Sequence, residues 1–237
     1  MVDEYLTMVV GNSIVVVPEV EGAAAYDDLI NSILLAQLVA NKKIEKKPEV
    51  IWYDAYMEVL DAYWLRPQKA NQTWGFRHNA EELVPNAFTA MLTHGALGNA
   101  HTIAAVLARI AKLPDEEPAL QLLRSHMQAS VEPARAKVSA AATSVRLLVI
   151  DAKSPTSITS ACVEFKTRKV LSPNPFQQSY QSGDLHGLVH VHHACETLVE
   201  QLYGPVRAAI AIKVRDRLAG NVATLTLPKE VKSCRIP

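Results

Sequence analysis

Apolar residues recur along the chain with two different periods, which predict where helices and strands lie. Residues 5–10 and 13–17 are rich in β-branched side chains, with Gly11 and Asn12 between them. This pattern predicts two antiparallel strands joined by a two-residue turn. The period then becomes helical over residues 27–42, where apolar positions recur every three or four residues.

A second helical segment, residues 48–65, is rich in aromatic residues. Trp52, Tyr56 and Leu60 recur every four residues and therefore share one helix face, which we expect to be buried in a core. The opposite face carries three acids, Asp54, Glu58 and Asp61. No ExxH pair accompanies these acids, as a di-iron bundle would require, so we interpret them as a solvated surface.

The middle of the chain continues with helical segments. Residues 69–79 predict a polar loop, and helices are expected over residues 81–94 and 99–113. A further helix begins near Pro114 and fades before Pro133.

The period changes to two in the second half of the chain. Residues 143–150 and 157–170 alternate as strands do, and the five-residue turn at residues 151–155 favours an antiparallel hairpin. Residues 171–183 contain two prolines and no apolar period, so we expect a mobile loop. Two helices and a strand over residues 222–227 complete the order.

This order of elements lacks the regular strand–helix alternation of a doubly wound fold. The sequence predicts an α+β fold, with helices packed on a small antiparallel or mixed sheet. The alternative is a mainly helical protein with peripheral β-hairpins. We expect residues 1–237 to form a single domain and place any sub-boundary near residues 133–143.

Residues 185–203 contain half of the chain's eight histidines and predict one long helix. Its apolar residues follow at spacings of 3, 4, 3 and 4: Leu188, Val191, Cys195, Leu198 and Leu202. At about 100° per residue, His186, His190 and His193 fall on the opposite face, away from the core. The alternative is a strand, in which His190 and His192 share a face with Leu188.

The predicted histidine face is the strongest candidate for chemistry. Histidines four residues apart on a helix can share a zinc ion, and Glu200 continues the same face. His186, His190, His193 and Glu200 are therefore the candidate metal ligands, with a further ligand supplied from elsewhere. The competing interpretations are simple solvent exposure and a contact with the loop at residues 171–183. No cofactor is otherwise predicted.

Composition narrows the function classes. The chain has 24 basic and 24 acidic residues, and zero formal charge argues against a nucleic-acid binder that relies on a positive field. Weak charge repulsion also favours self-association. The cysteines, Cys162, Cys195 and Cys234, show no CxxC spacing, which is typical of reduced thiols in a cytoplasmic protein. The sequence contains no run of 18 consecutive apolar residues, so no transmembrane helix is predicted.

Three function hypotheses follow. The nucleotide-binding and hydrolase motifs GxGxxG, GxxxxGK[ST], HExxH and GxSxG are not found in the sequence, which favours a non-catalytic interaction or assembly protein that forms homo-oligomers or binds a protein partner. The alternative is a metal-assisted hydrolase that uses the histidine face. The third hypothesis is a membrane-active, toxin-like protein, because residues 157–169 alternate as an amphipathic hairpin would.

Overall fold

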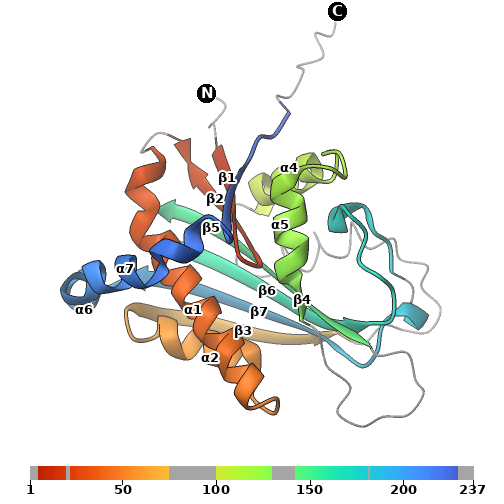
Figure 1. The fold of residues 1–237 in the computed structure, drawn as a ribbon, viewed down its shortest axis with the longest axis horizontal. Coiled ribbons are helices and arrows are strands. Elements are labelled where there is room, and N and C mark those ends of the chain that lie inside the picture. Colours follow the sequence, from red (N-terminus) through yellow and green to blue (C-terminus); the bar gives the residue numbers. More distant parts are fainter. Residues whose placement is uncertain (1–4, 20–21, 75–99, 130–141, 181, 229–237) are drawn as a thin grey trace, which may run out of the picture.

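The computed structural model describes residues 5–19, 22–74, 100–129, 142–180 and 182–228, and it has an α+β fold (Figure 1). The described strands form one mixed sheet in the order β3-β7-β6-β5-β2-β1-β8, with β4 paired to β5. Their bounds are β1 Tyr5–Val10, β2 Ser13–Pro18, β3 Trp64–Trp74, β4 Gln128–Ala129, β5 Thr143–Ser154, β6 Ser157–Thr167, β7 Val189–Leu198 and β8 Val222–Leu225. The α-helices are α1 Asp27–Lys46, α2 Trp52–Leu60, α4 Ala100–Ile110, α5 Pro118–Met127, α6 Glu200–Tyr203 and α7 Arg207–Leu218.

Helices cover both faces of the sheet (Figure 1). Helices α1, α2 and α7 pack on one face, here called the α2 face, and form one apolar core with it. Helices α4 and α5 pack on the other, here called the α4 face, and form a second core. Strands β5, β6 and β7 contribute to both cores, so their residues are buried on both sides of the sheet.

The predicted N-terminal hairpin is confirmed: β1 and β2 pair antiparallel, with Val10 opposite Ser13. Gly11 has φ 56°, a conformation that favours glycine, and a Cβ there would clash with the Gln37 side chain. Gln37 reaches the turn from α1, accepting a hydrogen bond from the Asn12 N–H and donating one to the Val10 carbonyl oxygen, both at 3.0 Å. One buried amide side chain therefore joins the hairpin turn to the first helix.

The aromatic helix is confirmed in its packing and shortened in its length. Trp52, Tyr56 and Leu60 are all buried in the α2-face core, as predicted. The Trp52 and Tyr56 rings stack with centroids 5.2 Å apart. The helix begins at Trp52 and ends at Leu60, because the chain turns after it and β3 begins at Trp64.

The helix predicted over residues 185–203 is wrong, and the strand alternative is correct over most of it. Strand β7 lies between β3 and β6, paired antiparallel to both. Leu188 is 52% exposed, although the predicted helix would bury it. The helical spacing of apolar residues arises because β7 is covered on both faces, so its buried positions need not alternate.

One predicted loop is wrong, and a second is a loop as predicted but is packed more closely than expected. Residues 69–74 continue β3 instead of forming a loop, since they pair with β7 as far as Trp74 opposite Val189. Residues 171–183 were expected to be mobile, yet Leu171, Asn174 and Phe176 are buried. Predictions for residues 75–99, and for the sub-boundary up to residue 141, lie outside the described residues. No helix in the described ranges is both long and apolar enough to cross a membrane.

Candidate functional site

The structure does not bring the four predicted metal ligands together. His190 and His193 lie on opposite faces of the sheet, because side chains alternate along β7. His186 is exposed in the segment before β7, where its backbone N–H donates a hydrogen bond to the Lys166 carbonyl oxygen at 2.8 Å. Glu200 begins α6 and pairs with Arg207 at 2.6 Å. In the part of the chain that the structure describes, no group of three or more His, Cys, Asp or Glu side chains could hold a metal ion.

His193 is buried, against the prediction that it faces away from the core. It lies on the α4 face with 3% of its surface exposed. Neither ring nitrogen has a hydrogen-bond partner among the described residues. Burial lowers the pKa of His193, so the neutral imidazole is favoured.

A second set of ionisable groups lies beneath α2 on the opposite face. Glu196 of β7 is only 1% exposed, and both of its carboxyl oxygens lie within hydrogen-bond distance of the Ser160 hydroxyl, at 3.1 and 3.2 Å. Burial raises the pKa of Glu196 to about 7, although Ser160 and Arg66 oppose the shift. The carboxyl group therefore gains or loses a proton near neutral pH.

A β-bulge places a cation near this carboxyl group. The pairing of β3 with β7 shifts between Leu65 and Gln68, so Arg66 and Pro67 occupy the irregular stretch. Arg66 pairs with Asp61, just after α2, at 2.5 Å. Its positive charge also acts on Glu196, where it lowers the carboxyl pKa against the larger effect of burial.

A further ion pair lies under the N-terminal turn of α2. Arg146 of β5 and Glu164 of β6 are directly opposite each other, with Nε and Oε1 2.9 Å apart. The Arg146 guanidinium lies 5.5 Å from the centre of the Trp52 ring. The His192 ring stacks on Tyr53 at 4.0 Å, and burial with nearby His190 lowers the His192 pKa to about 4. Aromatic side chains of α2 thus cover a row of ionisable residues on the sheet.

We interpret the buried ionisable residues beneath α2 as a structural network. Tyr53, Tyr56 and Glu196 are all buried, so the carboxyl group can exchange a proton but offers no accessible surface for a substrate. Paired charges beneath an aromatic helix also fix how α2 sits on the sheet.

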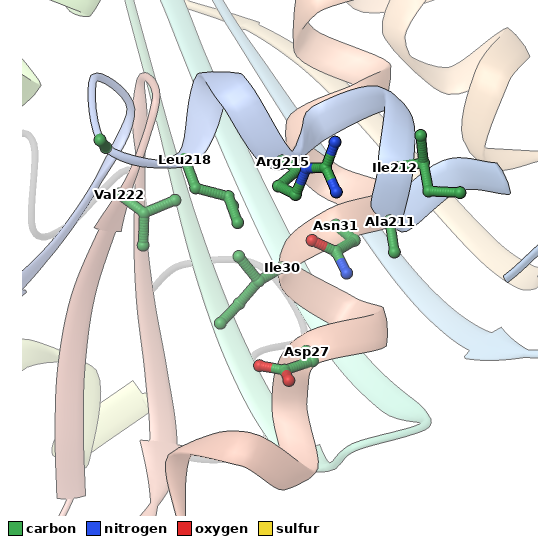
Figure 2. A pocket seen from close by; sticks show the side chains of 9 residues that line it. Asp27, Ile30, Asn31, Ala211, Ile212, Arg215, Leu218 and Val222 are labelled. Atoms are coloured by element: carbon green, nitrogen blue, oxygen red, sulfur yellow. The ribbon is translucent and has the colours of Figure 1, made fainter. Parts of the chain in front are cut away.

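The surface recess in Figure 2 lies between α1 and α7 and is the more accessible candidate. It has a volume of about 560 Å³ and is here called the α1–α7 groove. Its lining is mostly apolar, with Asp27, Ile30 and Asn31 from α1, Ala211, Ile212, Arg215 and Leu218 from α7, and Ala219 and Val222 beyond it. Ile212 is 64% exposed. Sequence reasoning missed this site, although an isoleucine within the cationic segment of residues 207–217 was a usable signal.

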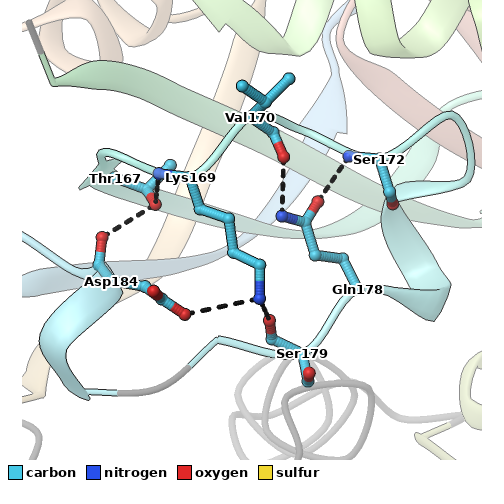
Figure 3. A network of polar contacts seen from close by, with 7 residues as sticks. All are labelled: Thr167, Lys169, Val170, Ser172, Gln178, Ser179 and Asp184. Atoms are coloured by element: carbon cyan, nitrogen blue, oxygen red, sulfur yellow. Dashed lines mark hydrogen bonds and ion pairs between the residues drawn. The ribbon is translucent and has the colours of Figure 1, made fainter.

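The segment from Thr167 to Asp184 is held by side-chain contacts to backbone atoms (Figure 3). Gln178 accepts from the Ser172 N–H at 2.6 Å and donates to the Val170 carbonyl oxygen at 2.9 Å. Lys169 reaches across the segment, donating to the Ser179 carbonyl oxygen at 2.8 Å and approaching the Asp184 carboxylate at 3.5 Å. These contacts order a segment that lacks apolar periodicity.

The same segment is attached to α4. Asn174 is buried, and its amide donates to the carbonyl oxygens of Ile110 and Leu113 at 3.0 and 3.2 Å. The Ile110 carbonyl oxygen also accepts from the Leu113 N–H at 3.0 Å, so the Asn174 amide adds a second donor there and supplies one to the Leu113 carbonyl oxygen just beyond α4. The loop therefore completes the α4-face layer, which argues for a structural role.

Comparison with known proteins adds no function to this geometry. No protein-family model matches the chain, and no curated protein matches it.

Proposed function

We propose that this chain is a non-catalytic interaction protein that self-associates in the cytoplasm and uses the α1–α7 groove as its docking surface. The observation that carries the proposal is a mostly apolar groove with the exposed Ile212 at its rim. Apolar surface that stays accessible on a folded protein is typical of contact sites. Burying one isoleucine side chain contributes about 1.5–3 kcal/mol to association.

The structure offers less support for the two alternative functions. The metal-assisted hydrolase required His186, His190 and His193 on one helix face, and β7 separates His190 from His193. The membrane-active hypothesis required an amphipathic hairpin over residues 157–169. Strand β6 is instead paired on both sides and contributes to both cores.

Two further observations support the proposal. The described cysteines, Cys162 and Cys195, are free thiols, in keeping with a reducing compartment. The formal net charge of zero leaves little overall repulsion between copies of the chain.

The proposal is tested by sedimentation velocity of the full chain across a concentration series, with Ile212→Ser as the variant. We expect the parent mass to rise with concentration and Ile212→Ser to remain monomeric over the same range. Leu188→Ser is the matched control, because Leu188 is also about half exposed but lies outside the groove. A parent that stays monomeric throughout would contradict self-association, and equal weakening in both variants would contradict the groove as its site.

A further inference from the structure

The α1–α7 groove carries one negative and one positive side chain, on opposite walls. Figure 2 shows Asp27 at the start of α1 and Arg215 in the last turn of α7, where Leu218 and Ile212 lie on either side of Arg215. Opposite charges thus stand across an apolar groove.

Neither charge is neutralised across the groove. Among the described residues, no ion pair joins Asp27 to a cation, although its neighbour Asp28 pairs with Arg207 at 2.8 Å. Of the acidic side chains that the structure describes, Arg215 approaches the adjacent Asp216, at 3.6 Å, and both side chains are largely exposed. Such an exposed pair contributes little, so Arg215 remains available to another carboxylate.

We propose that the groove binds the same groove of a second copy across a two-fold axis, with Arg215 of each protomer against the partner's Asp27. This inference rests on the proposed function and specifies its partner. In a two-fold interface one surface meets itself, so a contact from residue i to residue j is repeated from j to i. A surface that holds one anion, an apolar centre and one cation is self-complementary under this operation.

The charges also determine which arrangement is favoured. An arrangement that placed Arg215 against the partner's Arg215, or Asp27 against the partner's Asp27, would bring like charges together. The two-fold arrangement pairs opposite charges at both ends and encloses Ile212 between the protomers. In this arrangement the apolar centre supplies most of the affinity, and the two ion pairs set the register.

Charge reversal tests the reciprocal contact directly. Asp27→Arg places two cations at each end of the interface, and Arg215→Asp places two anions there. We expect each single variant to weaken homodimerisation by about tenfold or more, because like charges across an interface are strongly unfavourable. The double variant Asp27→Arg/Arg215→Asp restores opposite charges at both ends and should dimerise as the parent does.

An equimolar mixture of the two single variants provides the decisive result. In the mixed dimer, the arginine at position 27 of one chain meets the aspartate at position 215 of the other, and the second contact is the natural pair. We therefore expect the mixture to form heterodimers under conditions in which each variant alone is monomeric. Sedimentation velocity with one variant fluorescently labelled measures this, and unchanged melting curves for the separate variants verify their folding.

The outcomes separate the two proposals. A parent that dimerises while both single variants dimerise equally well overturns the Asp27–Arg215 pairing but leaves self-association standing. Single variants that lose dimerisation without rescue in the mixture also overturn the reciprocal contact. A parent that is monomeric at every concentration overturns both proposals.

Discussion

Two buried polar residues of β7, Glu196 on the α2 face and His193 on the α4 face, differ in whether they have a hydrogen-bond partner. On the α2 face, Glu196 has Ser160 as a hydrogen-bond partner and Glu164 is paired with Arg146. On the α4 face, His193 is equally buried but has no hydrogen-bond partner among the described residues. A buried polar group without a partner costs about 1–3 kcal/mol in desolvation, whereas a partnered one repays much of that cost. The comparison indicates that partners, not burial alone, decide which polar residues stabilise the fold.

The largest expected change in the free energy of unfolding comes from a substitution in the aromatic residues of α2. Trp52 is buried, stacks on Tyr56, and donates from its indole nitrogen to the Asn41 side chain at 2.7 Å. We expect Trp52→Ala to lower the free energy of unfolding by about 3–5 kcal/mol, because the substitution leaves a cavity above Arg146. Urea denaturation measures the change. The neighbouring Ile51 is exposed, so Ile51→Ala should change stability by less than about 0.5 kcal/mol. Equal losses in both variants would contradict the packing of this helix.

The second expected effect is a pH dependence that originates on the α2 face. The pKa of Glu196 is about 7 in the folded protein, above the value of about 4.3 for an unfolded glutamate. The protonated carboxyl therefore stabilises the fold fully below about pH 4, and this contribution is lost as pH rises through 7.

We expect Glu196→Gln to remove this loss, because the amide stays neutral at every pH. Between pH 4 and pH 8, the parent should lose on the order of 3 kcal/mol of stability relative to the variant. Urea denaturation over this pH range checks the difference. The exposed Glu45 provides the control variant Glu45→Gln, which should follow the parent. Parallel pH profiles for the parent and Glu196→Gln would show that Glu196 does not hold a proton in the fold.

The smallest expected change in the free energy of unfolding comes from a substitution on the α4 face. His193→Leu replaces a ring that has no hydrogen-bond partner among the described residues with an apolar side chain, so we expect stability at pH 7 to stay the same or rise by about 1 kcal/mol. Because burial lowers the pKa of His193, the parent should lose stability below about pH 6.5, and the variant should lose less. Thermal unfolding at pH 5 and pH 7 tests both points, with the exposed His190→Leu as control. A loss of several kcal/mol in His193→Leu would mean that the ring has a structural partner.

Local signals predicted part of this fold well. The Gly11-Asn12 turn, the helix that begins at Asp27 and the aromatic face of α2 each follow from neighbouring residues, and the structure confirms them. The α+β class also followed, because its evidence was the order of the elements. These features depend on spacing within about 20 residues, which a sequence displays directly.

The predictions that failed depend on partners distant in the chain. Strand β7 has a helical apolar spacing, yet pairing with β3 and β6 on either side makes it a central strand. The α1–α7 groove combines Asp27 with Arg215, almost 190 positions apart, so no local pattern could associate them. The candidate metal ligands share a face only in the predicted helix, and that face disappears once those residues form a strand.

The central claim is that copies of this chain associate through α1 and α7. Hydrogen–deuterium exchange of the full chain, compared at low and high protein concentration, tests it most directly because it locates the contact. We expect amides in residues 27–36 and 207–218 to exchange more slowly at high concentration, while those of α2 and β3 remain unchanged. Protection that rises instead along β3, or exchange that is independent of concentration throughout, would contradict the account.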